Sequence, residues 1–307
     1  MTQSNSHMLI VGSVARDTIH NNQGTHEYVL GGSAVFASLA GAFYATPRLV
    51  GVVGRDFPDS EVALLKSKGV DVSGLEVVDG KTFHWEGRYS ADLTSRESLK
   101  TELNCFAEFH PKIPDGFRDT PYVMLGNIHP DLQIEVLDQM REPKLVIADT
   151  MNFWIEGTPE PLRAMLKRID VLVINEEESR QLAGTYNIID VAHRLLEMGP
   201  KIAVIKRGEY GALLFEGDQV FSAPAYPVAP VLDPTGAGDS FAGGMLGYLA
   251  REDSLDHDTF RKAVIHGSAL ASFCVAGTSV ERLVSVTAEE VEARYRAFAD
   301  LAHFEKR

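Results

Sequence analysis

The residues best able to do chemistry lie in the segment Asp233–Gly244, which reads Asp-Pro-Thr-Gly-Ala-Gly-Asp-Ser-Phe-Ala-Gly-Gly. Gly236 and Gly238 leave the backbone free to point several N–H groups one way. They stand just before an apolar pattern that predicts a helix over Ser240–Ala250. N–H groups at the start of a helix attract an anion. The segment therefore predicts a phosphate-binding turn that can also stabilise a phosphoryl group in transfer.

Asp239 adds a carboxylate to this turn. A negative side chain repels a resting phosphate, so it suits a general base that takes a proton from an attacking hydroxyl. The alternative is a glycine-rich turn in which Asp239 only caps the helix. Ser240 offers a different chemistry, serine hydrolysis, although Ala242 stands where a nucleophile elbow has its last glycine. A non-catalytic metabolite sensor is the third alternative, and it has no physical need for a base at position 239.

The rest of the chain alternates short apolar strands with helical patterns, which is typical of a parallel sheet with helices on both faces. Strands are predicted at 9–12, 48–54, 70–78, 122–125, 144–148, 170–174 and 201–205. Helices are predicted at 34–44, 59–68, 131–140, 159–168, 176–197, 239–250, 257–275 and 287–299. The segments Gly211–Phe215 and Gln219–Ser222 have the pattern of a hairpin.

The segment from Lys81 to His110 differs, because apolar and polar residues alternate in it and aromatic residues are frequent. This alternation predicts antiparallel strands with one wet face. No linker or internal repeat divides the chain. We therefore expect one large α/β domain that carries a small inserted β element.

Composition limits the function further. The chain has 307 residues and a formal net charge of −14, which disfavours nucleic acid or an anionic membrane as a partner. The two cysteines, Cys105 and Cys274, cannot build a disulfide framework. No apolar run approaches the length of a membrane span, and Met1–Met8 does not have the pattern of a signal peptide. A cytoplasmic enzyme is the expectation.

The segment Asp233–Gly244 resembles the C-terminal signature of the ribokinase-like (PfkB) sugar and nucleoside kinases. Further motifs resemble those of the family and occur in its order, so the resemblance spans about residues 8 to 285. These motifs are Gly12-Ser13 with Asp17, Gly31-Gly32, Gly54-Arg55-Asp56, Gly69-Val70-Asp71, Asn175-Glu176-Glu177-Glu178 and Lys206–Gly211.

The resemblance implies a three-layer α/β/α domain over residues 8–307, with a mostly parallel sheet and a β lid formed by about 14–30 and 81–110. It implies transfer of the γ-phosphate of ATP to a hydroxyl, with Asp239 as the base. The N–H groups of Gly236, Ala237, Gly238 and Asp239 would form the anion hole. A lid would exclude water from the reacting groups.

The resemblance also implies where ATP and its ions bind. Asn175 and Glu178 would organise Mg²⁺, largely through water; the alternative is a solvated first helical turn. Lys206 and Arg207 would meet the polyphosphate, or form a surface pair. The adenine would lie between the loop of Gly208 and Gly211 and the helix carrying His266 and Ala269. Asp233 and Thr235 are similar to residues that hold K⁺ in many relatives.

On the acceptor side, the resemblance assigns Asp17, with Gly31 and Gly32, to the hydroxyls of the substrate; a turn-capping role is the alternative for Asp17. Ribokinases carry an Asn where this chain has Phe36, which predicts a changed specificity. Arg88 and Arg96 of the lid could reach substrate or phosphate, or remain solvated strand charges. Asn152 is a further candidate contact. The expected acceptor is a small sugar or polyol, with a nucleoside second, and the exposed lid edges also predict a homodimer.

Overall fold

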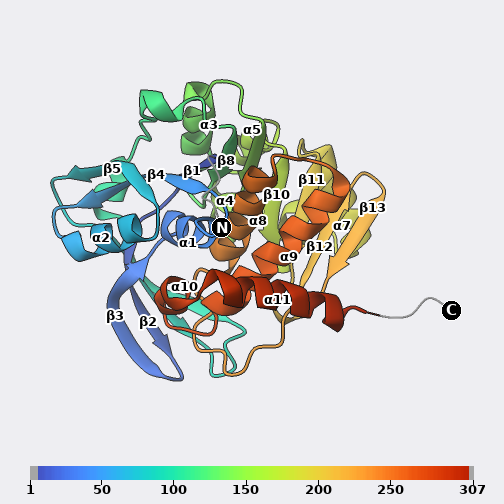
Figure 1. Cartoon of the computed structure of the whole chain (residues 1–307). Coiled ribbons are helices and arrows are strands. Elements are labelled where there is room, and N and C mark those ends of the chain that lie inside the picture. Colours follow the sequence, from blue (N-terminus) through green and yellow to red (C-terminus); the bar gives the residue numbers. More distant parts are fainter. Residues whose placement is uncertain (1–5, 304–307) are drawn as a thin grey trace.

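The computed structural model describes residues 6–303 and contains a large and a small β-sheet (Figure 1). The large sheet has the strand order β13-β12-β11-β10-β9-β8-β1-β4-β5. Every neighbouring pair from β5 to β11 is parallel, whereas β12 and β13 are antiparallel additions. The strands are β1 (His7–Val11), β4 (Thr46–Gly54), β5 (Asp71–Val78), β8 (Tyr122–Leu125), β9 (Leu145–Ala148), β10 (Val171–Asn175), β11 (Ile202–Lys206), β12 (Ala212–Glu216) and β13 (Gln219–Ala223).

Helices cover both faces of this sheet, because its strands are apolar on both sides. Ile10 of β1 joins a core that lies under one set of helices, and its neighbours Leu9 and Val11 join the core on the other face. The first set is α1 (Ser33–Gly41), α2 (Asp59–Ser67), α8 (Ala237–Glu252), α9 (His257–Cys274), α10 (Glu281–Ser285) and α11 (Ala288–Leu301). The second set is α3 (Pro130–Gln139), α4 (Asn152–Gly157), α5 (Pro159–Leu166), α6 (Glu176–Ala183) and α7 (Ile188–Glu197). The expected three-layer α/β/α class is confirmed.

The small sheet has the order β3-β2-β6-β7 and projects from the larger one (Figure 1). Its strands are β2 (Ala15–Asn21), β3 (Gly24–Gly31), β6 (Phe83–Tyr89) and β7 (Arg96–Glu102). The two hairpins are antiparallel, as expected, but β2 and β6 pair in parallel. These two strands both leave the main domain in the same direction, which makes the sheet mixed. We call this sheet the lid.

Two other expectations need correction. The helix predicted over 176–197 is two helices, because Gly184 adopts a left-handed conformation that ends α6. The strand pattern expected up to His110 stops at Glu102. A 3₁₀ helix, η1 (Asn104–Glu108), follows it, and there the rings of Phe83, Phe106 and Phe109 stack. The short helices α4 and α10 were not predicted, because each has too few residues to show a helical period.

The hairpin β12–β13 and the remaining helices and strands agree with the sequence pattern to within a few residues. Part of Met1–Met8 and the end of the domain at 307 lie outside the described residues. None of the helices within residues 6–303 has the length and apolarity needed to cross a membrane.

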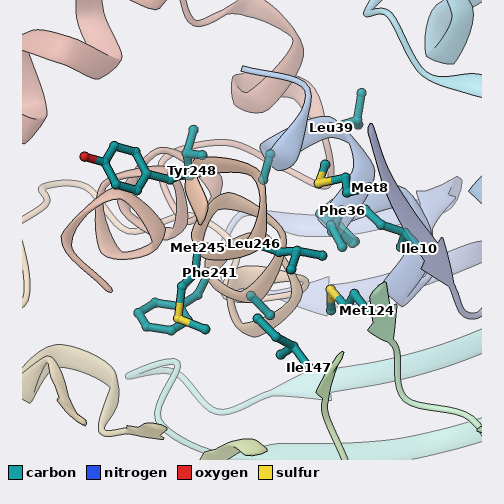
Figure 2. Packing of buried hydrophobic residues seen from close by; sticks show 14 of the residues in the cluster. Met8, Ile10, Phe36, Leu39, Met124, Ile147, Phe241, Met245, Leu246 and Tyr248 are labelled. Atoms are coloured by element: carbon teal, nitrogen blue, oxygen red, sulfur yellow. The ribbon is translucent and has the colours of Figure 1, made fainter. Parts of the chain in front are cut away.

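The helix that carries the candidate catalytic turn, α8, packs tightly on α1. Figure 2 shows Phe36 of α1 next to Leu246 of α8, with Met124 of β8 below them. The two helices approach so closely at Gly243 that a Cβ there would collide with the backbone of Ala37. This contact fixes the start of α8 relative to the sheet.

We therefore expect Gly243→Ala to destabilise the fold. The clash with backbone atoms costs about 1–3 kcal/mol, which exceeds the gain in helix propensity of about 1 kcal/mol. Urea unfolding measures the difference. Gly157→Ala is the matched control, because a Cβ at Gly157 meets nothing within 4 Å. Equal midpoints for Gly243→Ala and the unaltered protein would contradict the close approach.

Candidate active site

The turn before α8 has the geometry of an anion hole. Gly236 is the N-cap residue and has a φ of 75°, a left-handed conformation that glycine adopts without strain. The helical hydrogen bonds begin at Ser240, whose N–H donates to the carbonyl of Gly236 at 2.8 Å. The N–H groups of Gly238 and Asp239 precede that ladder and are placed to bind an anion. The N–H of Ala237 instead donates to the carbonyl of Pro234 at 3.2 Å, so in this state Ala237 supports the turn.

Phe36 holds this turn from below. Its ring is buried, and a Cβ at Gly236 would collide with it. The sequence placed Phe36 among the substrate contacts because ribokinases have an Asn there. The structure shows that Phe36 packs under the anion-binding turn, so a direct contact between its ring and a substrate is not what distinguishes this chain. Only glycine satisfies both the φ and the space at position 236.

Asp239 lies in a crowded, negatively charged environment. Burial, together with the negative charge of Asp149, raises the pKa of Asp239 to about 7, while the cations Lys206 and Arg96 act in the opposite sense. The ammonium of Lys206 bonds Asp149 at 3.2 Å, and it lies 2.8 Å from where a Cβ at Gly238 would be. A carboxyl with a pKa near neutrality, next to an anion-binding turn, is suited to proton transfer.

Asp17 is the second buried carboxylate of the site. It lies on β2 of the lid and faces Gly31, where a Cβ would collide with its carboxylate. Burial and the charge of Asp233 raise the pKa of Asp17 to about 7. One of its oxygens, Oδ1, is buried without a hydrogen-bond partner among the described residues. An unsatisfied buried acceptor is costly, so this atom is ready to accept a hydroxyl proton from a bound ligand. Gly32, with a φ of 98°, lets α1 begin directly after it.

Asn175 and Glu178 form a capping box at the start of α6. The Asn175 side chain accepts the Glu178 N–H at 2.8 Å, and the Glu178 carboxylate accepts the Asn175 N–H at 3.3 Å. Burial, and next the charge of Asp149, raise the pKa of Glu178 to about 7. A divalent cation would relieve this repulsion, so the residues fit Mg²⁺ held mainly through water. The motif is thus both a helix cap and a cation-compatible pair of oxygen ligands.

The two residues proposed for K⁺ have structural partners. Asp233 accepts the N–H groups of Thr235 and Ser279, both at 2.9 Å, and so ties the loop before α8 to the chain after α9. The hydroxyl of Thr235 bonds the phenol of Tyr89 at 2.9 Å, which joins the lid to the same loop. These bonds use one lone pair of each carboxylate oxygen and leave others for a cation.

Lys206 and Arg207 diverge at the end of β11. Lys206 turns into the site, whereas Arg207 pairs with Glu176 at 3.1 Å on the outer side, over Tyr210. Of the two glycines that follow, Gly208 has open space around it. Gly211 lies so close to the Ala223 carbonyl that no Cβ fits, which makes it a packing glycine.

His266 and Ala269 do not lie beside the other site residues. The ring of His266 is stacked between Tyr248 and Tyr295, with centroids at 4.1 and 4.0 Å, and it bonds the Tyr44 hydroxyl at 2.9 Å. Both faces of the ring are therefore occupied, and Ala269 is fully buried in α9. The sequence could not distinguish small residues that leave room for a base from small residues that pack helices.

The structure also separates the remaining candidates. Arg88 and Arg96 lie on opposite faces of the lid, because Arg96 is paired with Tyr89 and Arg88 with Glu97. The face of Tyr89 is the one turned to the site, so Arg96, and not Arg88, is the lid arginine on the site side.

Asn152 is exposed at the first turn of α4. Ser240 is completely buried and its hydroxyl has no partner among the described residues, so a serine hydrolase lacks its base.

Sequence reasoning missed Asp149 and Tyr89 as site residues. Asp149 follows β9 just as Asn175 ends β10 and Lys206 ends β11. Because β9, β10 and β11 are adjacent and parallel, their carboxyl ends meet at one edge, and this rule could have revealed Asp149. Tyr89 had no such signal, since its role depends on how the lid packs.

Comparisons with known proteins identify the family and the fold. The model for the pfkB family of carbohydrate kinases matches residues 132–285. The chain is similar to cytidine kinase of Thermococcus kodakarensis, at 30% identity over 258 residues that cover 81% of this chain and 90% of that protein. Its fold is similar to that of a nucleoside kinase from Methanocaldococcus jannaschii, with a TM-score of 0.77, 20% identity, and coverage of 96% and 99%. An Arabidopsis thaliana ribokinase complexed with ribose and ATP gives a TM-score of 0.76 at 21% identity, with coverage of 95% and 99%.

A helix start with N–H groups outside the helical ladder, next to a carboxyl with a raised pKa, is suited to phosphoryl transfer. The matches above identify the family: the chain belongs to the pfkB family of carbohydrate kinases. The recognition made from the Asp233–Gly244 segment is thereby confirmed.

The raised pKa of Asp239 predicts a trade-off between stability and function. The pKa of the Asp239 carboxyl is about 7 in the folded protein, whereas an unfolded Asp has a pKa of about 3.9. The free energy of unfolding therefore falls as the pH rises from about 3.9 through about 7. Asp239→Asn removes that charge. We expect its Tm to exceed that of the unaltered protein by roughly 2–4 °C at pH 8, with a smaller difference at pH 5.

Asp218→Asn, in the exposed turn of the β12–β13 hairpin, is the control and should leave Tm unchanged at both pH values. A Tm for Asp239→Asn below that of the unaltered protein at pH 8 would contradict the crowding of charge around Asp239.

Proposed function

We propose that this kinase transfers the γ-phosphate of ATP to a hydroxyl of the sugar part of a nucleoside. The observation that carries the proposal is the placement of the Asp239 carboxyl at the N–H groups that begin α8, beside a lid whose Tyr89 bonds Thr235 and whose strand β2 carries the buried Asp17. The first carboxyl would take a proton and the second would hold hydroxyls. The similar cytidine kinase of T. kodakarensis favours a nucleoside over the free sugar or polyol that the sequence placed first.

The reaction divides among the residues as follows. The acceptor hydroxyl is held by Asp17 and directed at Asp239, whose carboxylate accepts its proton. The acceptor oxygen then forms a bond to the γ-phosphorus, and the bond from that phosphorus to the β–γ bridging oxygen breaks, so that ADP leaves. The N–H groups of Gly238 and Asp239 stabilise the charge on the γ-phosphoryl oxygens.

Lys206 and its partner Asp149 serve the nucleotide side. A buried ammonium beside Gly238 is placed to meet phosphate oxygens, and Asp149 keeps it charged and oriented until they arrive. Asn175 and Glu178 would hold Mg²⁺ through water. When bound, that ion neutralises the phosphate charge that develops during transfer. Gly208 gives the chain after β11 an open surface near the nucleotide, and K⁺ between Asp233 and Thr235 would brace the loop before α8.

A free sugar is the second candidate acceptor. A fructokinase from Vibrio cholerae in a fructose-, ADP- and calcium-bound form shares the fold with a TM-score of 0.77. We rank it second because that fructokinase is 21% identical to this chain, whereas the cytidine kinase is 30% identical over 81% of it.

We expect ADP release with Mg²⁺–ATP to be fastest with a ribonucleoside among a panel of nucleosides, pentoses, hexoses and inositols. Coupled-enzyme assays of kcat/KM for each acceptor measure this ranking. Omitting K⁺ in a parallel series tests the cation. A sugar or polyol with a higher kcat/KM than any nucleoside would overturn the proposed acceptor while leaving the kinase assignment in place.

The same assay tests the base. Asp239→Asn should lower kcat by about 10²–10⁴-fold, because the amide cannot accept the proton, while ATP still binds. In the unaltered enzyme, kcat/KM should rise with pH through about 7, because Asp239 acts only after it loses its proton. A flat profile between pH 5.5 and 8.5, or near-normal turnover by Asp239→Asn, would exclude Asp239 as the base.

A further inference from the structure

The lid turns one of its faces to the active site. Across β6 and β7, Tyr89 is paired with Arg96 and Gly87 with Ser98, so these side chains share a face with Trp85. The phenol of Tyr89 reaches Thr235 in the loop before α8, at 2.9 Å. On the neighbouring strand β2, the buried Asp17 is paired with Trp85 and so shares this face. The bond to Thr235 and the position of Asp17 show that this face of the lid is turned to the site.

Arg96 is held on this face by its neighbours. Its guanidinium carbon lies 5.3 Å from the ring centroid of Trp85, which is a cation–π distance. The indole lies across Gly87, where a Cβ would collide with it, and its N–H donates to the hydroxyl of Ser98 at 3.0 Å. The guanidinium is therefore aimed by a rigid ring instead of moving freely.

Arg96 carries a positive charge without an acidic partner among the described residues, and a phosphate could neutralise it. Among the ion pairs within residues 6–303, Lys206 has Asp149 as a partner, whereas Arg96 makes no ion pair within 4.0 Å. Its positive charge still acts on Asp17, Glu178 and Asp239, and lowers the pKa of each relative to burial alone. The guanidinium lies on the lid face that Tyr89 links to the loop before α8, and it keeps several N–H donors free.

We propose that Arg96 is a catalytic residue carried by the lid, whose guanidinium contacts the γ-phosphoryl group opposite the N–H groups of α8. This inference rests on the proposed phosphotransfer and adds a second source of charge stabilisation to it. Trp85 and Tyr89 are positioning residues, since they act by aiming Arg96. The bond between Tyr89 and Thr235 brings Arg96 into place when the lid lies over the loop before α8. Complete charge neutralisation is thereby restricted to the closed lid.

The kinetic test compares two arginines of the same lid. Arg96→Met should lower kcat by about 10²–10³-fold with little change in KM for the acceptor, because a donor to the transferring group is lost. Arg88→Met is the matched control on the opposite face and should stay within about twofold of the unaltered enzyme. Arg96→Lys, which keeps the charge but not the planar fork, should recover part of the loss. Equal losses in Arg96→Met and Arg88→Met, or none in either, would overturn the proposal.

A pH profile separates catalysis from lid packing. Since the charge of Arg96 lowers the pKa of Asp239, Arg96→Met should move the acid limb of kcat/KM to higher pH, and Arg96→Lys should not. Loss of packing alone would affect both variants alike and leave the limb in place. An unmoved limb in Arg96→Met would contradict a location of the guanidinium next to the reacting groups.

A binding experiment needs no acceptor and therefore distinguishes failure of this inference from failure of the proposed acceptor. The chain has two tryptophans, Trp85 and Trp154, so a Trp154→Phe background makes Trp85 the only indole. Mg²⁺–ATP, but not Mg²⁺–ADP, should change Trp85 fluorescence, because only the γ-phosphate draws on Arg96. Adding Arg96→Met should abolish the difference between the two nucleotides. Identical responses to ATP and ADP in the Trp154→Phe protein would reject the contact.

Discussion

The site depends on the crowding of carboxylates at one edge of a parallel sheet, where they must coexist with a polyanionic nucleotide. Asp149, Glu178 and Asp239 lie around a single buried ammonium, that of Lys206, and Asp17 faces them from the lid. Burial and mutual repulsion raise the pKa of three of these carboxyls to about 7. Such an arrangement is unfavourable in the empty protein and becomes favourable when cations and phosphate oxygens enter together.

The scaffold tolerates this local cost because the surrounding structure is rigid. The start of α8 is fixed by Phe36 below Gly236 and by the close approach of α1 at Gly243. Asp233 ties two loops together through backbone N–H groups, and the capping box of Asn175 and Glu178 fixes the start of α6. Groups held in this way need little reorganisation when charge moves, which is the main requirement of phosphoryl transfer.

The lid adds a positive charge to the site from the side opposite α8. Its inner face carries an indole, a phenol and a guanidinium, and the phenol is bonded to the loop that forms the anion hole. The lid and the loop before α8 are therefore directly linked. In the proposed reaction, a lid held over the site in this way would keep water away from the transferring phosphoryl group.

The amino-acid sequence by itself determined the α/β/α class, most strand and helix positions, and the turn around Asp239. These follow from local signals: the period of apolar residues, glycines before a helix, and a motif within twelve residues. It also indicated Asp17, Asn175, Glu178 and Lys206, through motifs that resemble those of the family and occur in the same order.

Only the tertiary structure decided the roles of Phe36, His266, Arg88 and Arg96. The local sequence around each residue is the same whether its side chain contacts a ligand or packs elsewhere. A buried aromatic ring, a histidine in a helix and an arginine in a strand therefore give no signal that distinguishes the two cases. For Arg88 and Arg96 the choice depended on strand register, because shifting a strand by one residue turns every side chain to the other face. For Phe36 and His266 it depended on packing against residues more than 150 positions away in the chain, Gly236 in one case and Tyr44 in the other. Contacts of this range carry no signal in a single sequence, because they arise only when distant segments come together in the fold.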